Sequence, residues 1–447
     1  MTYIPHTDKD RQEMLAAVGV DRIDDLYKAI PENVRFPDLD LPEPISELEI
    51  TQELHALSEA NLEVFHTSCF LGAGAYNHFI PSVVDHTIRR NEFYTAYTPY
   101  QPEISQGTLQ AIFEYQSLMA QLTGMDVSNA SHYDGATALA EAVILALNHH
   151  RGKRSKIVVS PAIHPHYRQV VRTYTQGMGL TIEGDEKCTT EAKELMKLLD
   201  EDTALVAVQY PDFFGNITDL TALGKAAKAS GALFCVVVNP LALGMLVPPG
   251  EFGADVVVGD GQPLGISPSF GGPTVGIFTT KNEYVRKMSG RLVGETEDNR
   301  GQRGFVLTLT PREQHIRRDK ATSNICTNQG LMALASAVYL SVMGKYGLRK
   351  VAELCYHKAH YAAERIDALK GYSLWNTHPF FHEFVVKCPR PVAEINELLL
   401  EWDILGGYDL GQEYPDLKDH MLIAVTEVIS KEEIDDLVDA LEEVSND

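Results

Sequence analysis

The chain has 447 residues, enough for two or more domains and a large buried core. Its 62 acidic and 38 basic side chains give a net charge of −24. This excludes nucleic acid as a general partner, because binding a phosphate backbone needs clustered Lys and Arg. No apolar run approaches the roughly 20 residues of a membrane span, and the N-terminus lacks the pattern of a signal peptide. The six cysteines are widely spaced, so we expect free thiols in a cytoplasmic protein without a metal site.

The first 65 residues predict helices that are interrupted by prolines. The predicted helices cover residues 8–18, 21–29 and 46–60, and the prolines stand at positions 31, 37, 42 and 44. Most of these residues are charged or polar. We therefore expect residues 1–65 to form a helical arm rather than a domain with its own core.

Two polar loops are predicted next. Residues 71–81 are rich in glycine, and residues 89–107 combine prolines and amides with Tyr94, Tyr97 and Tyr100. The second segment neither alternates like a strand nor repeats like a helix, so we expect a rigid loop that presents hydroxyls and rings. A surface loop whose tyrosines only pack remains an open alternative. An amphipathic helix is predicted at residues 108–122.

A regular alternation of strands and helices follows. Strands are predicted at residues 156–160, 180–183, 204–209, 232–238, 256–258 and 275–280, and helices at 135–150, 165–175, 190–199 and 220–230. This order predicts a mostly parallel sheet covered on both faces, in a large α/β domain over residues 66–330. Ligands of such sheets bind at the carboxyl ends of the strands.

The loop between the last two of these strands lacks a residue that this arrangement usually carries. In α/β enzymes that use pyridoxal phosphate (PLP), the strand–loop–strand unit here carries the lysine that binds the cofactor as a Schiff base. The loop at residues 259–270 contains no lysine, and Gln262-Pro263 occupies it. The segment predicts a PLP-type fold without its cofactor lysine.

The remainder predicts a small C-terminal α+β domain over residues 331–447. Residues 300–322 are basic and polar. A long apolar helix begins at residue 330 and continues to about 369. Strands are predicted at 381–387, near 405 and at 421–426, with helices at 392–402 and 431–443.

Three segments together resemble one family, the P-protein of the glycine cleavage system, which is glycine decarboxylase. They are residues 70–81, 94–107 and 320–329. In many prokaryotes this enzyme is split into two homologous subunits, and the chain is similar to subunit 1. The resemblance implies the PLP-dependent transferase fold type I, with a large mostly parallel-sheet domain and a small C-terminal α+β domain.

The resemblance also implies where the cofactor residues should stand. Subunit 2 of the family has an Asp facing the pyridine nitrogen and a His-Lys pair whose lysine forms the aldimine. In this chain the first position falls at Asn239 and the second at Gln262-Pro263. Neutral Asn does not hold the pyridine nitrogen protonated, and proline has no amine. We therefore expect no covalent cofactor on this chain and PLP on the partner subunit.

Two further positions are expected to be vestiges of the cofactor site. Gly135, Ala136 and Thr137 stand at a helix N-terminus that would suit a phosphate, although an ordinary capped helix start is favoured. His164 stands where fold type I enzymes place a ring-stacking residue, and here a structural histidine is favoured.

By the resemblance, this subunit completes the active site of its partner. The expected contributors to that site are Tyr94, Tyr97, Thr98, Tyr100, Gln101, Glu103, Ser105, Gln106, Thr322, Ser323 and Asn324. With subunit 2, as an expected α2β2 heterotetramer, the enzyme decarboxylates glycine and transfers the aminomethyl group to the lipoyl arm of H-protein. Arg312, Arg317 and Arg318 are a candidate docking surface for H-protein, with a solvated arginine-rich loop as the open alternative.

Two rival interpretations remain. One is an autonomous PLP enzyme that uses another lysine, for which Lys281 is the nearest candidate. The other is a non-catalytic regulatory paralogue. The favoured interpretation predicts catalysis only in the presence of a lysine-bearing partner. Neither rival interpretation predicts this result.

Overall fold

The structure, a computed structural model, describes residues 4–64, 67–188, 191–310, 314–321, 323, 325, 328–376 and 378–446. The chain divides into two units, Met1–Leu62 and Glu63–Asp447. The predicted helical arm over residues 1–65 stays a prediction. The predicted subdivision of the second unit at residue 330 stays a prediction.

The N-terminal unit contains two capped helices, α1 (Asp8–Val18) and α2 (Glu47–Glu59). Thr7 and Ser46 accept hydrogen bonds from the third residue of each helix, in capping boxes that fix where the helices begin. The helix predicted at residues 21–29 is wrong: only a short 3₁₀-helix forms, at Ile23–Tyr27. Arg22, which precedes this 3₁₀-helix, makes no side-chain cap hydrogen bond of the kind that begins α1 and α2.

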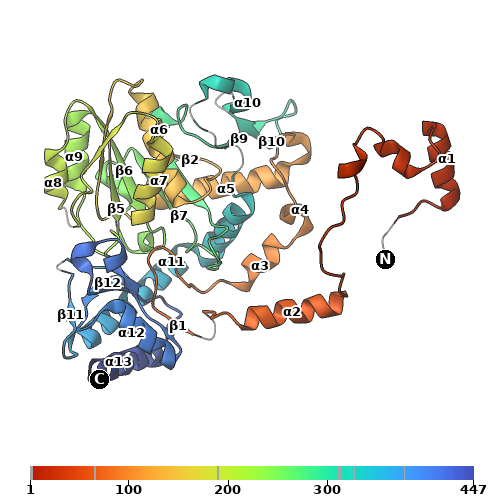
Figure 1. Ribbon diagram of the computed structural model, residues 1–447. Coiled ribbons are helices and arrows are strands. Elements are labelled where there is room, and N and C mark those ends of the chain that lie inside the picture. The colour runs from red at the N-terminus through yellow and green to blue at the C-terminus, as the bar shows by residue number, and fades with distance from the viewer. Residues whose placement is uncertain are drawn as a thin grey trace. The chain divides into compact units, whose positions relative to one another are not determined.

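A seven-stranded sheet forms the centre of the second unit (Figure 1). In spatial order its strands are β2 (Val127–Ser128), β8 (Gly276–Thr280), β7 (Val256–Asp260), β6 (Leu233–Val238), β5 (Thr203–Tyr210), β3 (Lys156–Val159) and β4 (Thr181–Glu183). The strands from β7 to β4 pair in parallel, whereas β8 pairs antiparallel with both β7 and β2. This confirms the predicted α/β fold with a mostly parallel sheet.

Helices cover both faces of this sheet, as the alternation predicted. They are α6 (Gly135–His149) and α7 (Pro165–Thr175) on one face, and α8 (Ala192–Lys197) and α9 (Thr221–Ser230) on the other. Successive strand residues point to opposite faces, so Ile157 packs with α6 and α7 while its neighbour Val158 packs with α8 and α9. Both faces are dry, which explains the continuous apolar strands.

The remaining helices include one that joins the large sheet to the C-terminal part. They are α3 (Ser82–Ile88), α4 (Asn91–Tyr94), α5 (Gln106–Thr123), α10 (Gln314–Arg317), α11 (Gly330–Asp367), α12 (Val392–Leu399) and α13 (Lys431–Asn446). By length and composition α11 is able to cross a membrane. Here it bends at Gly344 and packs against α3, α5 and α13, so its apolar side chains serve the core.

The C-terminal part contains a four-stranded antiparallel sheet in the order β11–β12–β15–β14. The strands are β11 (Ser373–Leu374), β12 (Glu383–Lys387), β14 (Tyr408–Asp409) and β15 (His420–Ala424). A parallel pair joins β1 (Ser68–Cys69) to β13 (Ile404–Leu405). The start of the second unit therefore pairs with its C-terminal part.

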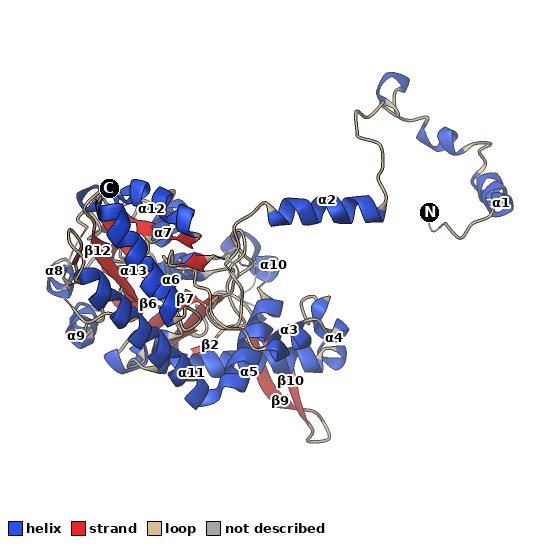
Figure 2. Cartoon of the chain, turned by 90° about the horizontal axis from the view of Figure 1, so that it is seen from below, coloured by secondary structure: helices blue, strands red, loops and turns tan. Residues whose placement is uncertain are grey.

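The sequence did not predict the hairpin of β9 (Leu292–Glu297) and β10 (Arg303–Thr308). Three of its strand residues are charged, Glu295, Glu297 and Arg303, and Arg303 pairs with Glu295 at 2.8 Å. Its apolar side chains Val293 and Phe305 pack against α5. Figure 2 shows the hairpin projecting beside α5.

Candidate functional site

The carboxyl ends of β3, β5, β6 and β7 surround a cavity of only about 40 Å³. Its lining includes His164, Gln209, Asn239, Asp260 and Pro263. The resemblance places the ring-stacking residue of the cofactor site at His164, the pyridine-facing residue at Asn239 and the lysine at Pro263. Ligand pockets usually measure about 300–1,000 Å³, so this cavity has room for little more than water.

Gln262, beside Pro263 at the lysine position, has a complete set of structural hydrogen bonds. The amide oxygen of Gln262 accepts from the backbone N–H of Tyr76 at 2.9 Å. Its amide nitrogen donates to the carbonyls of Tyr76 at 2.8 Å and Ile266 at 2.6 Å. The side chain is 3% exposed. Gln262 therefore joins the glycine-rich loop to the loop after β7.

The pyridine-facing and ring-stacking positions also have structural roles. The side-chain oxygen of Asn239 accepts from the backbone N–H of Leu241 at 3.0 Å. Nε2 of His164 lies 2.9 Å from the Ala73 carbonyl, and Nδ1 accepts from the backbone N–H of His166. Burial lowers the pKa of His164 to about 4, so the ring is neutral at pH 7. These contacts agree with the favoured expectation of a structural histidine.

The N-terminus of α6 contacts a carboxylate of the chain itself. Asp134 caps the helix by accepting from the Thr137 N–H at 2.7 Å. Asp260 accepts from the Gly135 N–H at 3.1 Å and from the Thr274 hydroxyl at 3.0 Å. Burial raises the pKa of Asp260 to about 6. An anionic side chain thus takes the position that suits a phosphate, and the capped helix start is the interpretation that fits these contacts.

The residues at this position do not fit PLP. They offer no amine for an imine, no carboxylate at the Asn239 position, and no space for a pyridine ring.

Replacing Pro263 by lysine is therefore expected to yield no aldimine. Ultraviolet–visible spectra of the variant with PLP are expected to lack the aldimine band, and borohydride is expected to trap no cofactor. A lysine-bearing fold type I enzyme serves as the positive control. A trapped pyridoxyl-lysine at residue 263 would contradict this prediction.

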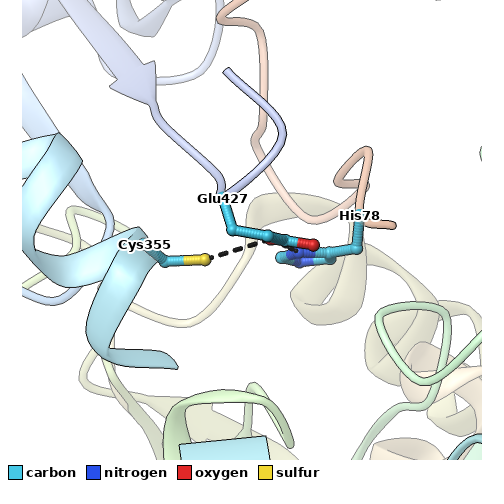
Figure 3. A group of neighbouring side chains, drawn as sticks. All are labelled: His78, Cys355 and Glu427. Carbon is cyan, nitrogen blue, oxygen red and sulfur yellow. Dashed lines mark hydrogen bonds and ion pairs between the residues drawn. The ribbon is translucent and has the colours of Figure 1, made fainter. Parts of the chain in front are cut away.

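The glycine-rich loop is held to the C-terminal part by a buried group of three side chains (Figure 3). Glu427 accepts from the Phe79 N–H at 2.7 Å, and its other oxygen lies 2.7 Å from Nδ1 of His78 and 3.3 Å from Sγ of Cys355. The three ligand-type atoms lie within 4.8 Å of one another. Both carboxylate oxygens are occupied, and the ammonium of Lys358, 2.6 Å from the Glu427 carbonyl, already supplies a positive charge. We interpret the group as a structural clasp.

A second buried carboxyl, that of Glu383 on β12, holds the same loop. Its oxygens accept from the Ala73 N–H at 2.9 Å and the Tyr76 hydroxyl at 2.8 Å. Burial raises the pKa of Glu383 from its ordinary value of 4.5 to about 7. At a pH between 4.5 and about 7, Glu383 is therefore protonated in the folded chain and ionised in the unfolded chain.

The stability contributed by this proton is therefore present below pH 4.5 and is lost as the pH rises through about 7. Between pH 6 and pH 8 the wild-type free energy of unfolding is expected to fall by roughly 1 kcal/mol relative to that of Glu383→Gln, which has no proton to lose. Urea unfolding at both pH values measures this difference. Parallel pH profiles for the two proteins would contradict it.

The tyrosine-rich loop and the end of the 320–329 segment line a larger cavity of about 240 Å³. Tyr97 and Thr98 come from the loop, while Asn328 and Gln329 come from the residues just before α11. Ala111, Ile112 and Leu334 give it an apolar wall. Two segments that the sequence singled out separately are thus adjacent. Asn328 and Gln329 were not among the candidate site residues, although they belong to the segment that carried the resemblance.

The tyrosines of the loop differ in exposure. Tyr97 is 76% exposed and Tyr94 61%, so both present their rings to solvent. Tyr94 ends the short helix α4, which the sequence assigned to the loop. Tyr100 is anchored: its hydroxyl accepts from Nη2 of Arg291 at 2.7 Å, and the guanidinium stacks 5.3 Å from its ring centroid.

The other candidates in this loop divide between exposed and structural side chains. Gln101 and Glu103 are exposed and Ser105 is half-buried. The amide of Gln106 donates to the Phe305 carbonyl at 2.9 Å and accepts from its N–H at 2.8 Å. Gln106 thus holds the hairpin β9–β10 to the start of α5.

Of the second group of candidates, Thr322 and Asn324 lie outside the described residues. The Ser323 hydroxyl donates to Glu141 of α6 at 3.0 Å and accepts from the Ile325 N–H at 3.1 Å. Ser323 is therefore held by these contacts. Burial raises the pKa of Glu141.

Arg317 and Arg318 of the candidate docking surface are exposed, and Arg312 lies outside the described residues. Arg317 lies beside Arg286, Lys287 and Arg291 around a small cavity of about 30 Å³. The sequence did not indicate Arg286 and Lys287, because they precede the arginine-rich segment by some 25 residues. Arg291 is buried, whereas Arg286 and Arg317 are exposed and Lys287 is half-buried. These three form a local basic surface on a chain of net charge −24.

Comparisons with known proteins give one family. Residues 1–441 match the family described as glycine cleavage system P-protein. A protein from Thermomicrobium roseum, named probable glycine dehydrogenase (decarboxylating) subunit 1, is 56% identical over 448 residues and covers 100% of both chains. Its namesake from Geobacillus kaustophilus is 55% identical over 442 residues, 98% of each chain.

Solved structures support the same family and fold. A crystal structure of glycine decarboxylase (P-protein) of the glycine cleavage system, in inhibitor-bound form, has a TM-score of 0.91 and 42% identity over 99% of this chain and 100% of that one. A cysteine desulfurase from Thermococcus onnurineus has a TM-score of 0.63 and 18% identity over 91% of this chain and 100% of that one, which shows the fold alone. The predicted fold type I is confirmed.

Proposed function

The chain belongs to the glycine cleavage system P-protein family, and on that premise we propose that it is the subunit of a two-chain glycine decarboxylase that does not bind PLP. The single observation that carries this proposal is the replacement of the cofactor site. Pro263 stands at the position of the lysine, and Gln262 and Asp260 beside it make hydrogen bonds within the chain, with Asp260 at the position that suits the phosphate. A homologous subunit 2 that has the lysine and binds glycine therefore supplies the PLP.

The contribution of this chain is then to position groups at the partner's site. The cavity beside Tyr97 and Thr98 offers hydroxyls and amides against an apolar wall. Loss of CO₂ from glycine requires a carboxylate that is held in one orientation and desolvated, and both are positioning tasks. The exposure of Tyr97 means that its ring is available to a neighbouring chain.

The basic surface around Arg317 supports the second part of the proposal, docking of lipoylated H-protein. Arg286, Lys287 and Arg317 gather charge from two separate segments, which favours a docking surface over a solvated loop. We place the assembly as an α2β2 heterotetramer in the cytoplasm, in which the aminomethyl group passes to the lipoyl arm of H-protein.

The autonomous alternative is disfavoured by the position of Lys281. Its ammonium lies 2.5 Å from Asp255 and 3.2 Å from the Gly253 carbonyl. Lys281 follows β8, which runs antiparallel to β7, so it stands at the opposite edge of the sheet from Pro263. A regulatory paralogue without catalytic role is the remaining alternative.

The test is glycine–bicarbonate exchange by this chain, by subunit 2, and by their mixture. Activity is expected only in the mixture, and exchange by this chain alone would overturn the proposal. In the mixture Tyr97→Ala is expected to lower the exchange rate by about tenfold or more, because the reaction depends on groups that hold glycine in one position. Tyr346→Ala, a change at a tyrosine that is 83% exposed on α11, is the matched control and is expected to have no effect.

A further inference from the structure

A four-residue segment directly after β2 is completely buried. Residues 129–132, Asn-Ala-Ser-His, are each 0% exposed. The Asn129 N–H donates to the Phe278 carbonyl of β8 at 3.2 Å. The His132 N–H donates to the Gly276 carbonyl of the same strand at 2.8 Å. Three of the four side chains are polar, and buried polar groups need partners within the protein.

Ser131 has a strained backbone. Its φ is +137°, in the region that favours glycine. Strain of this kind persists only where the surrounding structure imposes it, and it is concentrated at functional sites. A glycine at this position would relieve the strain but would have no hydroxyl. The presence of serine therefore points to a use for its hydroxyl.

The Ser131 hydroxyl holds one wall of the cavity of about 240 Å³. It accepts from the Gln329 N–H at 3.1 Å. The neighbouring carbonyl, that of Ala130, accepts from the side-chain amide of Asn328 at 3.2 Å. Asn328 and Gln329 both line the cavity, just ahead of α11. Residues 129–132 therefore set where this wall lies.

The same segment holds the turn that leads to Arg291. The Asn129 amide nitrogen donates to the Ser289 carbonyl at 3.1 Å. The Ala130 N–H donates to the Arg291 carbonyl at 2.8 Å. Gly290 has φ +79°, and an added Cβ would lie 2.6 Å from the Asn129 amide nitrogen. The turn therefore approaches the segment so closely that a side chain at position 290 would displace it.

The hydrogen bonds of His132 have one direction. Because the Ser289 carbonyl only accepts, the Asn129 atom beside it is the amide nitrogen, which also lies 3.3 Å from Nδ1 of His132. Burial lowers the pKa of His132 to about 3, so the ring is neutral. Nδ1 therefore accepts, and Nε2 donates to the Ser289 hydroxyl at 2.8 Å. Ser289 is thus held by its side chain as well as by its backbone.

Arg291 connects this turn with the second wall of the cavity. Its guanidinium donates to the Tyr100 hydroxyl at 2.7 Å. Tyr97 and Thr98 precede Tyr100 in the same loop and line the cavity. Two walls that are distant in sequence are thus both held by residues 129–132, so their separation depends on this segment.

We propose that Ser131 is a positioning residue for the reaction of the two-chain enzyme. It acts through Asn328 and Gln329, which it keeps in place relative to the tyrosine-rich loop. This inference rests on the proposed function, which makes the cavity part of the partner's site. A displacement of about 1 Å in such a site is enough to lower a rate as much as a hundredfold.

The test compares two buried serines that make the same kind of contact. Ser160, 5% exposed and directly after β3, accepts from the Ala162 N–H at 3.2 Å. Ser131→Ala and Ser160→Ala are therefore expected to lower the melting temperature of the full-length chain by similar amounts. In the mixture with subunit 2, only Ser131→Ala is expected to lower the turnover number of glycine–bicarbonate exchange, by about tenfold.

Ser131→Gly separates position from stability. It relieves the strain at φ +137°, so its melting temperature is expected to be higher than that of Ser131→Ala. The hydroxyl is still missing, so the turnover number is expected to stay about tenfold below that of the unaltered mixture. A purely structural role predicts instead that turnover recovers together with stability.

Three results would overturn the inference. Equal turnover by Ser131→Ala and Ser160→Ala would show that the contact with Gln329 has no part in the reaction. Recovery of turnover in Ser131→Gly would show that Ser131→Ala acts only through stability. Recovery of turnover by Ser131→Ala at a saturating concentration of subunit 2 would show that the residue serves pairing of the chains.

Failure of the proposed function gives a different result. In that case the unaltered mixture shows no exchange, and the inference falls with it. An active unaltered mixture together with a fully active Ser131→Ala mixture rejects only the positioning role.

Discussion

Replacing Gly215 by alanine is expected to destabilise the protein by about 4 kcal/mol or more, a loss typical of a severe backbone clash. Gly215 has φ +84° in the turn after β5, and an added Cβ would lie 1.9 Å from the Glu383 carbonyl oxygen of β12. The same turn accepts a hydrogen bond from the Phe381 N–H at 3.1 Å. Relief of the clash would separate the large sheet from the C-terminal sheet.

Gly253→Ala is the matched control for this prediction. Gly253 has nearly the same backbone conformation, φ +87°, but nothing lies within 4 Å of an added Cβ. Its expected cost is only the left-handed strain of about 1–2 kcal/mol. Denaturant unfolding of both variants measures the difference, and equal losses would mean that the contact with β12 contributes nothing.

Arg291→Ala is expected to reduce glycine–bicarbonate exchange by the two-subunit enzyme roughly a hundredfold, because a displacement of about 1 Å in a positioning group is enough for such a loss. The guanidinium is buried, 4% exposed, and holds Tyr100 through its hydroxyl and its ring. Tyr97 and Thr98 lie within three residues of Tyr100 and line the cavity. Without Arg291 the loop loses the anchor that sets their position.

Tyr100→Phe separates the two contacts, because it removes the hydrogen bond and keeps the stacked ring. We expect a smaller loss of about three- to tenfold in the turnover number, consistent with about 1 kcal/mol for the net contribution of a hydrogen bond to a half-exposed hydroxyl. Melting temperatures and affinity for subunit 2 serve as controls for folding and pairing. Full turnover by Arg291→Ala would show that the loop is positioned without it.

Local sequence signals predicted most of the regular structure. The helix at residues 165–175 has the predicted bounds because Pro165 stands at its first position and His164 caps it. The helix at residues 8–18 is likewise bounded by a Thr7 cap and Gly19. Continuous apolar strands predicted the parallel sheet, since burial on both faces leaves no polar alternation.

The hairpin β9–β10 and the composition of the site were not predictable in this way. The hairpin strands mix apolar and polar side chains. Contacts with α5 that are distant in sequence stabilise the hairpin, such as that of Gln106 with Phe305. Arg286 and Arg317 meet only through the tertiary fold. The sequence identified the missing lysine at Pro263, but not that Gln262 and Asp260 had taken over its surroundings.

The carboxylate of Asp260 has an evolutionary consequence. It satisfies the α6 N-terminus internally, and it would repel any phosphate that returned. Recovery of cofactor binding would require a lysine at Pro263 together with changes at Asp260, Gln262 and Asn239, and each of these three changes would remove hydrogen bonds that the fold now uses. Because several changes are needed at once, the loss of cofactor binding by this subunit is hard to reverse. We therefore expect selection to keep the genes of the two subunits together in one genome.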